Sequence, residues 1–185
     1  MRRLVLVSGC VIALAAVAGC QKHDNNVRVA VEGDGRFPPK LAGTWKDGKR
    51  GWEFVIEPDG TISSGVIENG SLRVFPNKQK VVTVSTKRGT GVYELGPWTV
   101  QYSPDQRELS VGAVVEHYKL DMGSFAMEGN STDWFTGPVS DDGRTWEAQW
   151  FSFPKAVASA EGEDDLVFEQ DPNDNPVETL VFQRQ

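Results

Sequence analysis

The sequence predicts an all-β fold, with an antiparallel meander closed into a small β-barrel and a β-sandwich as the alternative. Three observations support this prediction. From residue 41 onward, apolar and polar residues alternate with a period of two in short runs, as they do in half-buried strands. Dipeptides that favour tight hairpins separate these runs, and turn residues recur every eight to thirteen positions. No long helical period interrupts this spacing, which is typical of small barrels and sandwiches.

One strand of the pattern places Trp52, Phe54 and Ile56 on one face, with Glu53 and Glu57 on the other. Further strands are expected at residues 72–74, 82–84, 98–102, 109–111, 114–118, 122–128, 145–153, 166–169 and 177–182. The hairpin dipeptides are Asp59-Gly60, Asn69-Gly70 and Asp142-Gly143, which tolerate a positive φ. Residues 156–160 are expected to form one helical turn before an acidic loop.

The first nineteen residues have the parts of a secretory signal peptide. A basic start, Met1-Arg2-Arg3, precedes an uncharged apolar stretch at residues 4–18, and residues 21–26 are polar. A stretch of 15 such residues is shorter than the roughly 18–20 that a membrane-spanning helix needs. The sequence therefore predicts a signal peptide at residues 1–19.

The end of this segment, Val17-Ala18-Gly19-Cys20, resembles the lipobox of bacterial lipoproteins. The resemblance implies that the Cys20 thiol carries fatty acyl chains such as palmitate, and that the chain is cleaved just before it. An ordinary secretory signal that happens to contain a cysteine is the alternative. Gln21 replaces the Asp that often retains such proteins in the inner membrane. The resemblance therefore also implies an outer-membrane location facing the periplasm, in a cell with two membranes.

The expected organisation is a lipidated N-terminus with a flexible tether at residues 20–40, which could include an edge strand, followed by a single all-β domain at residues 41–185. Without the signal peptide the chain has 17 Lys and Arg against 26 Asp and Glu, a formal net charge of −9. This acidity argues against nucleic-acid partners, whose phosphates favour clustered basic residues. With Cys10 removed and Cys20 acylated, no thiol remains for a disulfide or a zinc site.

A second resemblance lies within the predicted β-domain. Gly43-Thr44-Trp45 opens it and resembles the Gly-x-Trp motif of lipocalins, and Thr132-Asp133-Trp134 resembles their Thr-Asp-Tyr motif with Trp in place of Tyr. Arg184 could match the family's arginine that packs on the first-strand tryptophan, with Arg144 as the rival. The resemblance implies a lipocalin-like barrel with a cavity for a small apolar ligand, closed at one end by Gly43, Trp45 and Arg184. Two features depart from the family: no helix is predicted after the last strand, and residues 129–142 are rich in turn formers.

The candidate ligand-binding residues are large aromatic side chains. Trp146, Ala148 and Trp150 share one face of a predicted strand, and Trp134 lies just upstream. Such faces line cavities or form packed cores, and the two interpretations overlap where a core is hollow. The full candidate set is Trp52, Phe54, Trp98, Trp134, Trp146 and Trp150.

No set of residues points clearly to catalysis or to a metal site. His117 is the one histidine of the predicted domain, and no Gly-x-Ser-x-Gly nucleophile motif accompanies it. A hydrolase that uses cross-strand carboxylates stays open as a third hypothesis, with candidates at Glu53, Glu57, Glu94, Glu116, Asp121, Glu128 and Asp133. Residues 171–176 imitate the start of a calcium loop, but Pro176 takes the place of the required Gly and Phe182 that of the final Glu. We therefore expect an ordinary turn there, with weak calcium binding left open, and no cofactor.

These observations favour a non-enzymatic, membrane-anchored domain that binds or carries a small apolar ligand. A structural or protein-interaction module of the cell envelope, with a filled core, is the alternative. The two hypotheses differ in whether the tryptophans surround a cavity.

Overall fold

The structure is a computed structural model that describes residues 26–33, 35–67, 71–171 and 176–185. The predicted signal peptide and Cys20 lie outside these residues. The fold is all-β, as predicted, and it consists of one 13-stranded sheet and a single turn of 3-10 helix, η1 (Pro39–Leu41). No helix among the described residues has both the length and the apolar character that crossing a bilayer requires.

The strands follow one another in this order. They are β1 (Val27–Val31), β2 (Gly43–Asp47), β3 (Glu53–Ile56), β4 (Ile62–Ile67), β5 (Leu72–Val74), β6 (Val81–Thr86), β7 (Gly89–Leu95), β8 (Trp98–Ser103), β9 (Glu108–Asp121), β10 (Phe125–Pro138), β11 (Thr145–Ala160), β12 (Leu166–Glu169) and β13 (Glu178–Arg184). The main path across the sheet runs β1-β8-β9-β10-β11-β13-β2-β3-β4-β5.

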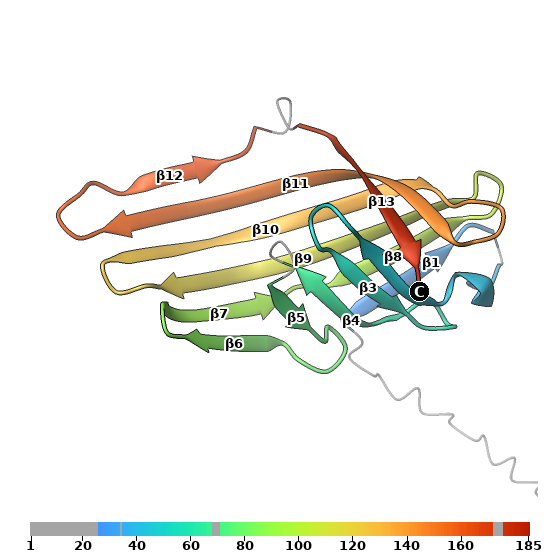
Figure 1. The fold of residues 1–185 in the computed structure, drawn as a ribbon. Coiled ribbons are helices and arrows are strands. Elements are labelled where there is room, and N and C mark those ends of the chain that lie inside the picture. The colour runs from blue at the N-terminus through green and yellow to red at the C-terminus, as the bar shows by residue number, and fades with distance from the viewer. Residues whose placement is uncertain (1–25, 34, 68–70, 172–175) are drawn as a thin grey trace, which may run out of the picture.

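Three long antiparallel strands, β9, β10 and β11, lie side by side in the sheet and extend along most of the molecule (Figure 1). They have 14, 14 and 16 residues, so each spans about 45–55 Å at the usual rise per residue. Different short strands pair with their two halves: β8 and β7 share one edge of β9, while β13 and β12 share the far edge of β11. The long strands therefore join two regions.

We call one region the wing: β6, β7 and β12, with residues 115–121, 125–131 and 154–160 of the long strands. The remaining strands and the other halves of the long strands form the body. In the body the sheet rolls over, so that β3 and β4 face β8 and β10 (Figure 1). Trp98 packs directly on Gly65 of β4, where an added Cβ would lie 2.7 Å from the indole.

The rolled sheet is not closed into a barrel. Its path ends at β1 and β5, and no ladder joins these two strands in the part of the chain that the structure describes. The core instead fills the space between the facing layers with large side chains. Trp45, Trp98, Trp146, Phe54, Phe135 and Phe182 are all less than 2% exposed.

Part of the predicted tether belongs to the sheet. β1 pairs in parallel with β8 and forms one end of the main path. It is the edge strand that the sequence allows within the predicted tether. Val27 and Phe37 are buried, and the Asn26 side chain donates a hydrogen bond to the Gly96 carbonyl at 2.6 Å. The described domain therefore begins well before residue 41.

Two local predictions were wrong, and both errors concern the long strands. Residues 156–160 do not form a helical turn but continue β11, where they pair with both β10 and β12. Residues 129–138, interpreted as turn-rich, are the second half of β10. Long-range ladders on both sides override the local preferences of Ala, Gly, Asn and Asp in these segments. Asp59-Gly60 and Asp142-Gly143 do form the expected turns, with positive φ at both glycines, whereas Asn69-Gly70 lies outside the described residues.

Candidate ligand-binding cavity

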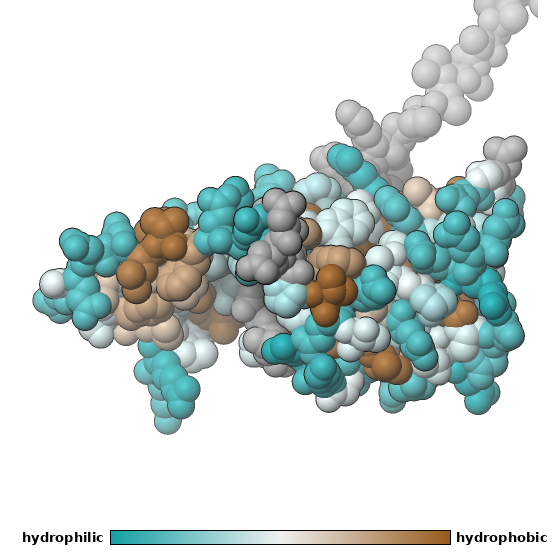
Figure 2. All heavy atoms as spheres, turned by 90° about the horizontal axis from the view of Figure 1, so that it is seen from above, coloured by the Kyte–Doolittle hydropathy of each residue, from teal (hydrophilic) through white to brown (hydrophobic). Residues whose placement is uncertain are grey.

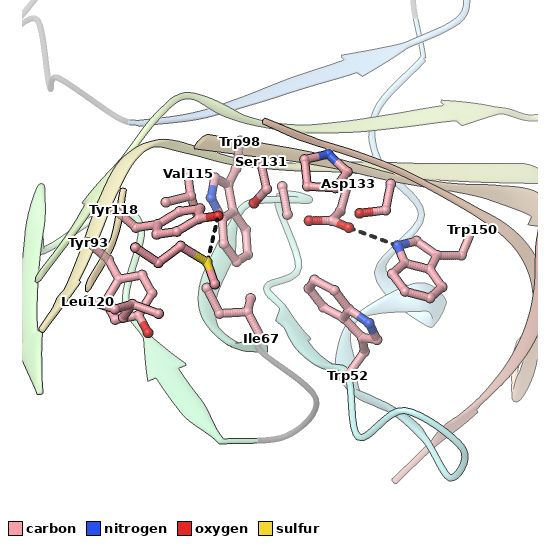
Figure 3. A pocket seen from close by; sticks show the side chains of 14 residues that line it. Trp52, Ile67, Tyr93, Trp98, Val115, Tyr118, Leu120, Ser131, Asp133 and Trp150 are labelled. Carbon is pink, nitrogen blue, oxygen red and sulfur yellow. Dashed lines mark hydrogen bonds between the residues drawn. The ribbon is translucent and has the colours of Figure 1, made fainter. Parts of the chain in front are cut away.

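A cavity of about 250 Å³ lies where the body meets the wing (Figure 3). The inner faces of β9, β10 and β11 form its floor, and Trp52 and Ile67, next to β3 and at the end of β4, lie across from them. The layer that covers the body stops here, so the cavity is the place where the filled core gives way to open space.

Three tryptophans from three elements form the body side of the cavity. Trp52, Trp98 and Trp150 all line it, and the rings of Trp52 and Trp150 meet edge to face with centroids 6.1 Å apart. Trp98 donates its indole hydrogen bond to the Val114 carbonyl at 3.2 Å. Trp52 is 5% exposed, and its indole nitrogen has no hydrogen-bond partner among the described residues. The described residues on this side of the cavity therefore offer the Trp52 N–H no acceptor, and a buried N–H group without a partner is costly.

A small polar patch lies among these rings. Asp133, on the inner face of β10, is 7% exposed and accepts a hydrogen bond from the Trp150 indole nitrogen at 2.9 Å. Burial raises the pKa of Asp133, while hydrogen bonds from Ser152, Trp150 and Ser131 oppose that shift. The net direction is upward, so the patch favours a neutral, protonated carboxyl more than a solvent-exposed aspartate would.

Replacement of Asp133 by asparagine should change how stability depends on pH. The native state keeps the proton at pH values where the unfolded chain, with an ordinary pKa of 3.8, has lost it. The free energy of unfolding that depends on Asp133 is therefore largest below that value, and it falls as pH rises towards the raised native pKa. Asp133→Asn should remove this decline, so the variant gains stability relative to the wild type as pH rises above the ordinary pKa of 3.8. Urea titrations at several pH values measure the free energy of unfolding of both proteins. If the stability of Asp133→Asn relative to the wild type stays constant or falls as pH rises, the pKa of Asp133 is not raised.

The wing side of the cavity is apolar and comes from β7, β9 and β10. Tyr93, Tyr118, Leu120 and Met127 line it, and the Tyr118 hydroxyl lies 3.7 Å from the Met127 sulfur (Figure 3). A β-bulge places Tyr118 there: on β9, Val115 and Tyr118 pair with Ser131 and Gly129 of β10, so β9 has one extra residue. Both side chains consequently point inward although three positions separate them.

Half of the predicted ligand-binding aromatics line the cavity: Trp52, Trp98 and Trp150. Phe54 and Trp146 are completely buried in the body core and do not line it. Trp134 lies elsewhere. Successive residues of a strand point to opposite faces, and Phe135 occupies the inner face, so Trp134 covers Gly112 on the outer face.

The residues predicted to close one end of the barrel do come together. Arg184 is the cross-strand partner of Trp45, and an added Cβ on Gly43 would lie 3.2 Å from the Arg184 side chain. The Arg184 guanidinium donates to the carbonyls of Lys40 and Ala42. Arg144, the rival, meets this group only through its carbonyl, which accepts a bond from the Arg184 amide at 2.9 Å.

A charged cluster holds the β2–β3 turn beside the cavity. The guanidinium carbon of Arg50 lies 5.4 Å from the ring centroid of Trp150, and Glu178 binds both Arg50 and Lys49, at 2.7 and 2.6 Å. The hydrogen bond from Arg50 is the main cause that lowers the pKa of Glu178. Asp47 accepts hydrogen bonds from the backbone amides of this turn. The rim near Trp52 and Trp150 is thus tied to β13.

The candidate catalytic residues do not converge on the cavity. His117 is exposed on the outer face of β9 and pairs with Glu128 at 2.8 Å, a hydrogen bond that lowers the pKa of Glu128. Glu53 pairs with Arg73 at 2.8 Å. Asp133 is the one carboxylate among the described lining residues, whereas a glycosidase needs two. The described residues also contain no group of three or more His, Cys, Asp or Glu that could hold a metal ion. Most of the predicted calcium loop lies outside them.

Sequence reasoning did not identify the wing side of the cavity. Tyr118 and Met127 lie in predicted strands and Leu120 lies between two of them, whereas Tyr93 lies in β7, which was not predicted. Nothing in the linear pattern indicates the bulge that turns Tyr118 inward. The sequence marks Asp133 only as part of the Thr-Asp-Trp motif and as one of several candidate acids. Comparisons with models of protein families, with curated proteins and with solved structures found no match.

Proposed function

We propose that this protein is a lipid-anchored lipoprotein of the bacterial cell envelope whose β-domain binds a small, mostly apolar ligand. Cys20 would carry the acyl chains, and the outer membrane facing the periplasm is the proposed location. The observation that supports ligand binding best is the cavity bounded by Trp52, Trp98 and Trp150, with the single buried acid Asp133 among them. An apolar wall with few, grouped polar atoms is the usual composition of a small-molecule site.

The size of the cavity fits a small ligand better than ordered water. It would hold about eight waters at their liquid volume, but its walls offer polar partners mainly at Ser131, Asp133 and Ser152. An apolar ligand would remove the aromatic walls from water at about 25 cal/mol for each Å² buried. The proposal also retains a lipocalin-like arrangement of the first-strand tryptophan and the last-strand arginine, on a sheet that is rolled but not closed, supported by the grouping of Gly43, Trp45 and Arg184.

Filling the cavity should abolish ligand binding. Ser131 is half-buried and lines the cavity, so the ring of Ser131→Phe would occupy the space that a ligand needs. The neutral fluorophore phenylnaphthylamine, titrated while tryptophan quenching is followed, should bind the wild type and bind this variant at least about tenfold more weakly, which is about 1.4 kcal/mol.

The neighbouring variant Thr132→Phe is the matched control. Thr132 is also half-buried, but it pairs with Val114 and Phe153 on the outer face of the sheet. It adds the same ring and should leave the affinity for the fluorophore unchanged. Equal affinities of the two variants, or a wild type that binds no fluorophore, would remove the proposal.

A second candidate function, a protein-interaction module, is favoured by the surface of the wing. Figure 2 shows apolar residues gathered at the end of the molecule where β12 lies. Leu166, Val167 and Phe168 of β12 are 59%, 73% and 51% exposed, which is unusual for three consecutive apolar residues. Cross-linking from β12 in intact cells tests this candidate, and it fails if no envelope protein is captured.

A further inference from the structure

The cavity does not end at the wing but continues along it. Tyr93 and Leu120 line both the cavity and a second hollow of about 290 Å³, whose other lining residues include Leu72, Val84 and Gly91. The two hollows therefore adjoin each other on the inner face of the sheet, and we refer to them together as the trough. From Asp133 to Met127 it follows six residues of β10, about 20 Å at the rise of an extended strand, and it continues across β7 to β6.

The buried carboxyl of the trough lies at its inner end. Asp133 and Ser152 lie near Trp150 at this end, and Ser131 lies on the side of Asp133 that faces Trp98 (Figure 3). Trp52, whose indole N–H has no partner among the described residues, lies across from them. Along the wing the lining is mainly apolar, with Tyr93, Leu120 and Met127, then Val84 next to Gly91. Polar side chains, among them Thr86 and Arg88, line the far part of the second hollow. A ligand complementary to this surface has one compact polar group and a long aliphatic part.

The charged residues near Asp133 indicate which charge the head group of a ligand should have. The cavity lining contains the acid Asp133 and no Lys, Arg or His among the described residues, and Arg50 at the rim is already paired with Glu178. A carboxylate or phosphate head would bring a negative charge into a buried site whose described lining residues offer no cation to balance it. An ammonium head has donors but no acceptor to offer the Trp52 N–H, whereas a hydroxyl has both a donor for Asp133 and acceptor lone pairs for Trp52.

We infer that the ligand is a neutral single-chain amphiphile, with a hydroxyl head held between Asp133 and Trp52 and an aliphatic chain that lies along the wing towards Val84. This inference rests on the proposed function, because it specifies the ligand of the same cavity. Chain length and head group would then affect affinity separately, because the head contacts Asp133 and Trp52 whereas the chain contacts the wing near Val84.

A chain-length series tests the path of the aliphatic chain. Hexanol, dodecanol and octadecanol, the longer two carried in cyclodextrin, would be titrated against the wild type, Val84→Gln and Val92→Gln by displacement of phenylnaphthylamine. Val84 is half-buried and faces the trough, whereas Val92 is 36% exposed on the outer face of the adjacent strand. Octadecanol should bind the wild type and Val92→Gln at least about tenfold more tightly than dodecanol does, because each buried methylene adds up to about fourfold in affinity.

Val84→Gln should lose that advantage of octadecanol while keeping the wild-type affinity for hexanol, which is too short to reach it. The inferred chain path is wrong, while ligand binding stands, if the alcohols and the fluorophore bind but octadecanol binds no more tightly than dodecanol. The same conclusion follows if Val84→Gln and Val92→Gln have equal affinity for octadecanol. If neither the fluorophore nor any alcohol binds, the proposed function itself fails.

The head group is tested with dodecanoate and dodecylamine beside dodecanol on the wild type. Dodecanol should bind at least about tenfold more tightly than either, because it alone brings no charge into the buried site and can still pair with both Asp133 and Trp52. The inference of a hydroxyl head is overturned if the carboxylate or the amine binds as tightly as the alcohol.

Discussion

Truncation of Trp146 to alanine should lower the free energy of unfolding by about 3–5 kcal/mol, the range for deletion of a large aromatic side chain from a core. Trp146 is fully buried and stacks on Phe182 with ring centroids 4.7 Å apart, and its edge meets Trp45 at 6.2 Å. Its indole N–H donates to the Leu109 carbonyl at 3.1 Å, so truncation also removes a buried hydrogen bond. The two facing layers of the body lose a contact that neighbouring rings cannot replace without moving.

Trp134→Ala provides the matched control, because it removes the same side chain from the outer face of the sheet. Trp134 is half-buried over Gly112, so we expect a loss of about 1–2 kcal/mol. Chemical denaturation followed by circular dichroism measures both variants. Equal losses would contradict the assignment of the two residues to different faces.

The exchange Cys20→Ser should abolish lipid attachment completely. Serine has no thiol to receive the acyl-bearing group, so the proposed lipoprotein would stay unprocessed or become soluble. The loss is large in energetic terms, because two or three acyl chains anchor a protein at about 0.8 kcal/mol for each buried methylene. Metabolic labelling with palmitate, followed by separation of membrane and soluble fractions, measures the effect.

Cys10→Ser controls for the loss of a cysteine in general. Cys10 lies in the apolar part of the predicted signal peptide, and its exchange should leave labelling and location unchanged. Palmitate incorporation into Cys20→Ser at the wild-type level would refute the lipobox interpretation, and with it the proposed location.

The strands that the sequence predicts well are those with large residues on one face. In β11, Trp146, Ala148 and Trp150 alternate with polar residues, and the structure places all three on the inner face. Asp59-Gly60 and Asp142-Gly143 mark real hairpins because positive φ is a local property of the residues themselves. The all-β class follows from such local signals.

What could not be predicted depends on pairing between distant segments. β10 has Gly, Ser and Thr at many positions, and its 14 residues stay extended because β9 and β11 pair along both edges. Trp134 and Phe135 are adjacent aromatics, and only the register decides which one reaches the core. The same holds for the cavity, since the bulge in β9 that turns Tyr118 inward has no recognisable sequence signal.

The central claim is that the cavity beside Trp52 holds a ligand, and the indole N–H resonances of the six tryptophans test it most directly by NMR during titration with dodecanol. Trp52 has an N–H without a partner, and Trp150 donates to Asp133 at the same site, so both resonances should shift in step with saturation. Trp45 and Trp146, which donate to backbone carbonyls in the core, should stay in place. Unchanged Trp52 and Trp150 signals at saturating alcohol, or shifts confined to Trp134 on the outer face, would contradict the account.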